Sequence, residues 1–303
     1  MLFPIGRSVL NALQLSLRQD VHNPFRAVRN LNLQASYQLS RYVAMAQDSD
    51  FINSAFDAAN PNKYIGPDAL DRTHQFSFGG TMEFPLHFRA NVIGHFYSGL
   101  PQTLTLNPTG LPGGMFVTGV NGDGTGDGYA PNGSNGTLGS ILPGTNLGSF
   151  GRGINGGNIN KVISNYNANF AGQATPAGNV LISNQLMTLS DLTALGGVMP
   201  LVAPAPADQQ NNAWLKDFDL SVNWTYKIKE YVSLQPGVGI FNVMNFANFD
   251  SPKNTLSGVL NGVEGSVNGT PYSQPSFLRT GLGSGVFGLG APRTLECSLK
   301  LNF

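Results

Sequence analysis

Hydrophobic and polar side chains alternate strictly along several stretches of the chain. In residues 30–40, NLNLQASYQLS, every odd-numbered residue is apolar and every even-numbered residue is polar. Successive side chains of an extended strand point to opposite faces, so a period of two predicts a strand with one apolar and one polar face. The same alternation predicts six further strands, in residues 10–19, 75–84, 88–98, 214–228, 231–244 and 293–303.

Two residues interrupt this alternation. Ile93 is an apolar residue at a polar position of the stretch 88–98. Pro236 lies inside the stretch 231–244 and has no N–H group to donate to a neighbouring strand. We therefore expect a bulge or another distortion of the sheet at Pro236.

The segments between these strands are alternately short and long. The short links lie near 20–28, 85–87 and 229–230, and the long ones are 45–73, 99–213 and 245–292. Short turns at one end and long loops at the other are typical of transmembrane β-barrels, whose turns face the periplasm and whose loops face the outside. The last residue of the chain falls on the short-turn side, as this arrangement requires.

The longest of these segments, 99–213, is rich in Gly, Asn, Ser and Pro. In a compact soluble domain, a structureless segment of this length would count against the strand assignment. On a barrel such a segment is ordinary, because loops that stand above a membrane need not pack into a core.

The polar faces carry few charges. Charged residues make up 11% of the chain, whereas soluble globular domains contain about 25%. Asn, Gln, Ser, Thr and Gly fill the polar positions instead, which favours an enclosed, hydrated interior over an open surface. The net charge is zero, which gives no electrostatic case for binding nucleic acid or anionic lipid headgroups. The single cysteine, Cys297, excludes a disulfide within the chain.

Aromatic residues gather toward the ends of two apolar faces: Phe76, Phe84, Trp214, Trp224 and Tyr226. Membrane barrels carry aromatic girdles at both interfaces, where one part of each ring is buried and the other part is wet. The alternative is that these rings fill the core of a β-sandwich, since aromatic residues are common in any strand.

No run approaches the roughly 18 apolar residues of a membrane-spanning helix. The first 19 residues lack the small-residue cleavage site of a secretory signal, so we expect any export signal to lie outside these 303 residues. Bacterial barrels have an even number of strands and at least eight, and an open edge in lipid leaves backbone groups unpaired. The seven predicted strands are therefore an incomplete barrel, and we favour their being part of a larger one over strands missed within the loops.

Five segments of the chain resemble, in order, the C-terminal barrel strands of the Oar-like TonB-dependent receptors. These receptors are outer-membrane proteins of Gram-negative bacteria with an N-terminal carboxypeptidase-regulatory-like domain and a plug. The segments are SDFINSAFDAAN (49–60), DRTHQFSFGG (71–80), FYSGLPQTLTL (96–106), IFNVMNFANF (240–249) and APRTLECSLKLNF (291–303).

The resemblance implies an all-β, antiparallel, up-and-down transmembrane barrel of 22 strands with long extracellular loops. Residues 1–303 would supply its last seven strands. It also implies binding or uptake of a bulky ligand with energy from TonB, although the plug that contacts TonB has no counterpart in this chain. Gly237 and Gly239 stand where the family tends to carry inward charged residues, so such a contact is not expected here.

We expect ligand contacts to come from the long loops and from the lumen-facing positions of the strands. The charged and polar candidates for lumen-facing positions are Gln34, Arg89, His95, Asp217, Asp219, Lys227, Glu296 and Lys300. The sequence does not identify the ligand.

The last strand ends in a pattern that matches the signal by which the outer-membrane assembly machinery recognises a barrel. The pattern consists of a terminal aromatic residue preceded by apolar residues at alternate positions: Leu295, Cys297, Leu299, Leu301 and Phe303. Any amphipathic terminal strand has similar residues, but the other six strands favour the assembly signal.

No pattern in the sequence indicates an enzyme or a cofactor. The four histidines are scattered without the H-E-x-x-H spacing of a zinc site, and there is no G-x-S-x-G nucleophile turn. The segment 119–130, GVNGDGTGDGYA, offers weak calcium candidates in Asn121, Asp123 and Asp127. It lacks the Asp and Glu that begin and end an EF-hand loop, so a flexible turn is favoured.

Two alternatives to the receptor remain open. The first is a smaller complete channel, closed by strands hidden in 99–213 or by oligomerisation. The second is a secreted β-sandwich adhesin, which predicts that Phe78 and Trp224 are buried against a second sheet.

Overall fold

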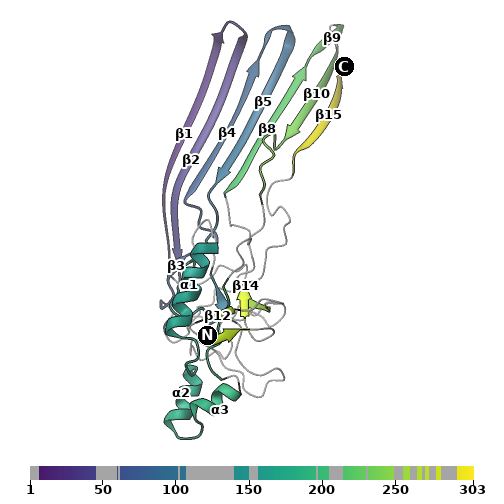
Figure 1. Ribbon diagram of the computed structural model, residues 1–303. Helices are drawn as coiled ribbons and strands as arrows, with labels where there is room; N and C mark the ends of the chain where they lie inside the picture. The colour runs from purple at the N-terminus through teal and green to yellow at the C-terminus, as the bar shows by residue number, and fades with distance from the viewer. Residues whose placement is uncertain are drawn as a thin grey trace.

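The structure is a computed structural model, and the residues that it describes form a long sheet with a smaller unit at one end (Figure 1). It describes residues 7–45, 60, 62–101, 103–106, 140–149, 156–195, 197–204, 214–229, 231–248 and 292–303, and the backbone of 255–259, 265–267, 270–272 and 278–280.

The sheet consists of seven long or medium strands and two short ones. They are β1 (Ser8–Phe25), β2 (Val28–Ala44), β3 (Gly66–Pro67), β4 (His74–Glu83), β5 (Phe88–Tyr97), β8 (Leu215–Trp224), β9 (Tyr226–Lys229), β10 (Val232–Phe241) and β15 (Thr294–Asn302). Their order is β1-β2-β4-β5-β8-β10-β15, all antiparallel, with β3 beside β2 and β9 beside β10. The predicted all-β, up-and-down topology is therefore confirmed, and the described sheet is not closed.

The register of the sheet keeps like residues together. One set of directly opposed residues runs across the sheet through Leu33, Gly80, Val92, Leu220, Ile240 and Leu295. We call the face that carries these residues the apolar face, and the opposite face the polar face. Because side chains alternate along every strand, this register gives the whole sheet one apolar and one polar side.

The first two strands are longer than the alternation predicts. The pairs Asp20–Asn32 and His22–Asn30 continue the ladder of β1 and β2 to a turn at 26–27, so the predicted link at 20–28 is wrong. Polar residues at these positions still alternate with Val21 and Leu31, so they lie on the polar face and do not end the strands.

The distortion expected at Pro236 lies in the neighbouring strand. Pro236 itself pairs with Leu299 in the ladder between β10 and β15. On the other side of β10, the ladder has a gap between the pair Asn223–Gly237, which joins β8 to β10, and the pair Tyr226–Leu234, which joins β9 to β10. The register is the same before and after this gap. A proline cannot donate to this ladder, which explains why the gap lies opposite it.

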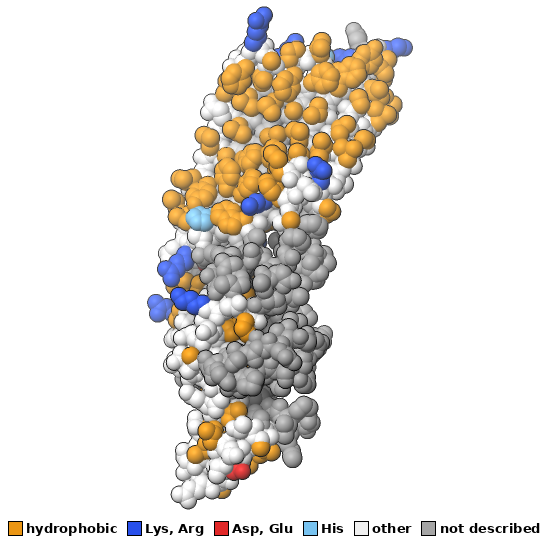
Figure 2. Space-filling view, viewed as in Figure 1, with side chains coloured by type: hydrophobic (Ala, Val, Ile, Leu, Met, Phe, Trp, Pro, Cys, Tyr) orange, Lys and Arg blue, Asp and Glu red, His pale blue; other side chains and the backbone are white. Residues whose placement is uncertain are grey.

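The apolar face is exposed. In Figure 2 its hydrophobic side chains cover the sheet from edge to edge, and Leu15, for example, is 56% exposed. Within the described residues, no second sheet covers this face, and Trp224 is 37% exposed while Phe78 contacts rings of its own sheet. The β-sandwich alternative is therefore wrong.

The described parts of the three long loops form a second body, which we call the loop unit. It contains β6 (Thr105–Leu106), β7 (Ser140–Ile141), α1 (Gly156–Asn169), α2 (Pro176–Ser183), α3 (Leu189–Ala194), β11 (Thr255–Val259), β12 (Gly265–Val267), β13 (Thr270–Tyr272) and β14 (Leu278–Thr280). None of the described helices is long and apolar enough to cross a membrane.

The loop unit has its own hydrophobic core. Apolar residues of α1 pack against β6 and against residues near 200, and the buried members are Leu104, Leu106, Leu142, Ile159, Ile163, Tyr166, Met199 and Val202. Loops above a membrane need not pack into a core, but the described parts of these loops do. The spacing of Ile159, Val162, Ile163 and Tyr166 is that of an amphipathic helix, and this signal was hidden by the Gly- and Asn-rich composition around it.

The three long loops are joined within this unit. In the sheet β14-β11-β6-β7, β6 of the second loop pairs in parallel with β11 of the third. The first loop joins through Tyr64, whose carbonyl accepts from the N–H of Leu147 at 3.2 Å. Gly148 has φ of +60°, and a Cβ there would collide with Pro67, so this junction requires glycine.

Candidate functional site: the polar face of the sheet

The polar face collects the charged residues of the sheet. Every acidic residue of its described strands lies on this face: Asp20, Glu83, Asp217, Asp219 and Glu296. The eight residues that the sequence predicts as lumen-facing also lie on the polar face. Five of them are at polar positions of β2, β5 and β8: Gln34, Arg89, His95, Asp217 and Asp219. The other three, Lys227, Glu296 and Lys300, are paired with residues at polar positions of β10, namely Ser233, Gly239 and Gln235.

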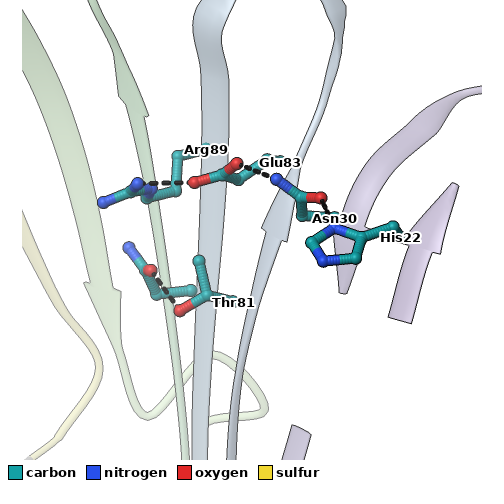
Figure 3. A network of polar contacts seen from close by, with 6 residues as sticks. His22, Asn30, Thr81, Glu83 and Arg89 are labelled. Atoms are coloured by element: carbon teal, nitrogen blue, oxygen red, sulfur yellow. Dashed lines mark hydrogen bonds and ion pairs between the residues drawn. The ribbon is translucent and has the colours of Figure 1, made fainter. Parts of the chain in front are cut away.

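A polar network crosses four strands next to the short turns (Figure 3). The Glu83 carboxylate at its centre accepts from Arg89 at 2.6 Å through Oε1 and from Asn30 Nδ2 at 2.6 Å through Oε2. Asn30 Oδ1 lies 2.6 Å from His22 Nδ1. Because Asn30 donates through its nitrogen and accepts through its oxygen, His22 carries its proton on Nδ1.

The register explains why these four side chains meet. His22, Asn30, Glu83 and Arg89 are directly opposed in β1, β2, β4 and β5. Arg89 is 57% exposed in its side chain, so the ion pair with Glu83 contributes at most about 1 kcal/mol to stability. Its main effect is to fix the orientation of a carboxylate and a guanidinium on the polar face.

The next set of opposed residues continues the network toward the loops. Thr81 donates to Asn91 Oδ1 at 3.0 Å, and Asn91 Nδ2 donates to Ser221 at 3.1 Å. A concavity of about 420 Å³ opens beside these two sets of residues, and its lining includes Glu83, Arg89, Asn91, Asn223 and Gln235. The lining of this concavity offers a polar ligand hydrogen-bond donors, hydrogen-bond acceptors and side chains of both charges.

Gly237 keeps the polar face open beside that concavity. A Cβ at this position would collide with the Asn223 side-chain oxygen and come within 2.7 Å of the Ser298 hydroxyl. The sequence difference from the receptor family at Gly237 and Gly239 therefore leaves room between the Asn223 and Ser298 side chains, and no charged side chain occupies it.

A second polar cluster lies nearer the loops. The Ser77 hydroxyl is 3.1 Å from His95 Nδ1 and 2.8 Å from the Tyr97 hydroxyl. Asp217 is opposed to His95, and Asp219 accepts from the N–H of Asn242 at 2.8 Å. A second concavity, of about 560 Å³, is lined by polar residues such as Gln34 and His95 and by apolar residues that include Ile93 and Phe78. The mismatched Ile93 thus adds an apolar contact to a polar surface.

Among the described residues, no three His, Cys, Asp or Glu side chains lie close enough together to hold a metal ion. The calcium candidates Asn121, Asp123 and Asp127 lie outside the described residues. The arrangement can bind a ligand through hydrogen bonds and charge.

Aromatic side chains border the apolar face at both ends. At the turn end, Trp224 stacks on Phe88 with centroids 5.8 Å apart, and its indole N–H donates to the Leu86 carbonyl. At the loop end, Trp214 stacks on His74 at 5.8 Å, and Tyr37 hydrogen-bonds His74 at 2.8 Å. Sequence reasoning missed His74 as part of this border, although its place in the alternation puts it on the apolar face.

The last strand presents its apolar side chains outward. Leu295, Leu299 and Leu301 are exposed on the apolar face, and Phe303 is 94% exposed. Cys297 lies in the same phase, opposite Val238.

Comparison with known proteins agrees with this geometry. No curated protein and no solved structure matches the chain. The family described as outer membrane beta barrel domain matches residues 1–279. An exposed apolar face bordered by aromatic rings, with all acidic residues on the other side, is the arrangement expected of strands that face lipid. The chain therefore belongs to the outer membrane beta barrel domain family and is an outer-membrane protein of a Gram-negative bacterium.

Proposed function

We propose that the chain is the C-terminal barrel portion of an Oar-like TonB-dependent receptor that binds or takes up a ligand through a plugged lumen. The ordered resemblance of five segments to these receptors gives the proposal its identity. In this proposal the chain has no enzymatic activity and no cofactor, and its plug and its contact with TonB are supplied by other parts of the receptor.

The observation that carries the proposal is the pair of unpaired sheet edges. Within the described residues, β1 and β15 each have a neighbour on one side only. In lipid, every backbone N–H and C=O needs a partner, and each unpaired group costs several kcal/mol. The sheet therefore requires further strands, which a 22-stranded receptor barrel would provide.

The edges are also poorly matched to each other. β1 has 18 residues and β15 has nine, so β15 can pair with only half of β1. This difference favours separate partner strands over closure of one sheet on itself or on a second copy. The smaller complete channel is therefore the second candidate.

The polar face and the loop unit suit ligand binding in such a barrel. In a closed barrel the polar face would line the lumen, with its two concavities along the path of a ligand. The loop unit lies at the end of the sheet opposite the short turns, where a receptor would first meet its ligand (Figure 1).

The exposed terminal strand fits recognition by the barrel-assembly machinery. Phe303 and the alternate residues before it would present the assembly signal, with the machinery as a further partner. Replacing Phe303 with Ser should lower the amount of folded protein in the outer membrane several-fold, and replacing the lumen-phase Asn302 with Ser should not.

The test of the receptor function uses the full-length gene product purified from outer membranes in detergent. We expect saturable binding to the purified periplasmic domain of TonB, measured by biolayer interferometry with a plug-free porin as control. Sequencing upstream of Met1 should reveal a plug-encoding segment. No TonB binding, together with stable single-channel conductance of the 303-residue product in planar bilayers, would instead establish the smaller channel.

A further inference from the structure

Basic side chains mark the loop-end boundary of the apolar face. Arg41 of β2, Lys216 of β8 and Arg293 just before β15 are exposed, and all three fall in the phase of the strand that carries the apolar residues. His74 of β4 shares this phase. In Figure 2, blue and pale-blue side chains follow the loop-side edge of the orange band.

These four residues lie on a line that is inclined to the hydrogen-bonding direction of the sheet. The position of each residue can be counted along its own strand from the opposed set Leu33, Gly80, Leu220 and Leu295. Arg41 is eight residues from this set toward the loops, His74 is six, Lys216 is four and Arg293 is two. The shift of six residues is about 20 Å along the strands, and it occurs over five strand spacings of together about 24 Å.

The inclination of this line matches the geometry of a membrane barrel. The two lengths give an angle of about 40°, which is within the usual tilt of strands in a membrane. A line inclined to the rungs of a sheet by the strand tilt runs parallel to the membrane plane. The four residues therefore lie at one depth, at the boundary of the hydrocarbon on the loop side.

A second pair of residues gives the thickness of the apolar band. Arg29 and Arg41 lie in the same phase of β2 and enclose Leu31 to Leu39. Twelve residues at a tilt of about 40° span roughly 31 Å of depth. This value fits a hydrocarbon core with one basic headgroup-level residue on each side.

Within the described strands, no acidic side chain shares this face with the boundary residues. All acidic residues of the described strands lie on the polar face, and none of Arg41, Lys216 and Arg293 forms an ion pair with a described residue. The Lys216 ammonium lies 5.9 Å from the centre of the Phe246 ring. The zero net charge of the chain thus conceals a separation in which the lipid-facing side carries only positive charge.

We propose that Arg41, Lys216 and Arg293 form a row of binding positions, about 31 Å long by the two lengths given above, for the phosphate groups of lipid A molecules in the outer leaflet of the outer membrane. The leaflet follows from the loops, which face the outside in this family of barrels, and the outer leaflet of Gram-negative bacteria is built on phosphorylated lipid A. Guanidinium and ammonium groups at headgroup depth recognise phosphate through charge-assisted hydrogen bonds. His74 lies between Arg41 and Lys216 on this line, and Trp214 stacks on it, so the two rings provide a flat surface for the glucosamine rings. This inference depends on the membrane location and not on the receptor function.

The zero net charge of the chain gives no electrostatic case for anionic headgroups, but it sums over two faces that meet different surroundings.

The experiment measures lipid binding by native mass spectrometry on the full-length gene product purified from outer membranes in mild detergent and stripped of lipid. The probe is bisphosphorylated lipid A, compared with dephosphorylated lipid A and with inorganic phosphate as competitor. The test variant is Arg41→Gln/Lys216→Gln. The matched control is Arg26→Gln/Lys229→Gln, which removes the same two residue types from exposed positions at the turn end.

We expect the test variant to bind bisphosphorylated lipid A about 30-fold more weakly than the unmodified protein, since each basic residue near an anionic surface contributes a factor of about five. Adding Arg293→Gln should weaken binding further. The control should change affinity less than three-fold, dephosphorylated lipid A should bind all proteins equally weakly, and inorganic phosphate should not compete at equal concentration.

The charge-conserving variant Arg41→Lys/Lys216→Arg keeps the test decisive if the neutral variant folds poorly, and it should retain affinity within about three-fold. Equal weakening in the test and control variants would mean that the cations only anchor the barrel at headgroup depth, and it would overturn the site. Binding that is independent of the lipid phosphates, or full competition by inorganic phosphate, would also overturn it.

Discussion

The sheet and the loop unit bury hydrophobic side chains in opposite directions. In the sheet, Leu15 and its neighbours on the apolar face point outward and the charged residues lie on the other side. In the loop unit, Ile163 and Tyr166 point inward and are 1% exposed. The same hydrophobic effect produces both arrangements, because the first region meets hydrocarbon and the second meets water. The boundary between the two patterns locates the edge of the membrane.

The largest expected effect comes from emptying the core of the loop unit. Ile163→Ala should destabilise this unit by about 2–5 kcal/mol, because it removes buried methyl groups and leaves a cavity. Hydrogen exchange should show faster exchange in α1 and unchanged exchange in β4 and β5. The exposed Val180 provides the control, since Val180→Ala should change stability by less than about 0.5 kcal/mol. Equal loss of protection in the sheet would show that the two regions are not separate.

The same comparison can be tested on the sheet by placing a charge on each face. Leu220→Arg puts a guanidinium near the middle of the apolar band and should cost about 2–4 kcal/mol in lipid vesicles. Ser221→Arg, one residue along, points to the polar face and should cost less than about 1 kcal/mol. Denaturant unfolding from vesicles measures both. A larger cost for Ser221→Arg would mean that the faces are assigned the wrong way round.

A smaller effect is expected on the stability of the loop unit at alkaline pH. Burial raises the pKa of Tyr166 above its ordinary value, and its hydroxyl donates to the Pro200 carbonyl at 2.9 Å. The unfolded loop unit releases this proton near pH 10 while the folded unit retains it, so stability should fall as pH rises above about 10.

Tyr166→Phe should cost about 1–2 kcal/mol at neutral pH and remove this part of the alkaline dependence. Thermal unfolding of the loop unit between pH 8 and 11, followed through hydrogen exchange or protease sensitivity, measures both quantities. An unchanged alkaline slope in the variant would assign the dependence to other groups.

The smallest effect is expected on the polar face. Glu83→Gln removes the charge that pairs with Arg89 and keeps one of the two oxygens that accept from Asn30 and Arg89. Because the pair is largely exposed, unfolding free energy should change by less than about 1 kcal/mol. Denaturant unfolding measures it, with Thr81→Val as a second variant of the same face. A loss above 2 kcal/mol would indicate that the network is a structural element of the sheet.

The sequence predicted the strands well because each has a face that must meet lipid and a face that must not. Alternation in 30–40 and 214–228 is a local signal, and a local signal can be recognised from the sequence alone. The pairing of β6 with β11 joins a two-residue strand to a five-residue strand about 150 positions away, and no local pattern indicates it. The helix α1 had a readable signal in Ile159, Ile163 and Tyr166, which the polar composition of its loop obscured.

The candidate sites divide in the same way. The phase of Asp217 and Glu296 followed from alternation, so their shared face was predictable. The contact of Glu83 with both Asn30 and Arg89 depends on the register of three strands. Alternation does not determine this register, because a shift of two residues keeps every side chain on the same face. The line through Arg41, Lys216 and Arg293 needs the register of the whole sheet, so it could not be drawn before the structure was known.

The chain has two tryptophans, and each borders a different end of the apolar band. Trp214 and Trp224 are 42% and 37% exposed, so they are almost equally accessible to a collision partner on their own side. A water-soluble quencher added outside sealed vesicles or intact cells therefore reaches only one indole of a correctly inserted sheet. Fluorescence from Trp224→Phe and Trp214→Phe would then report the orientation of the inserted protein without an added dye.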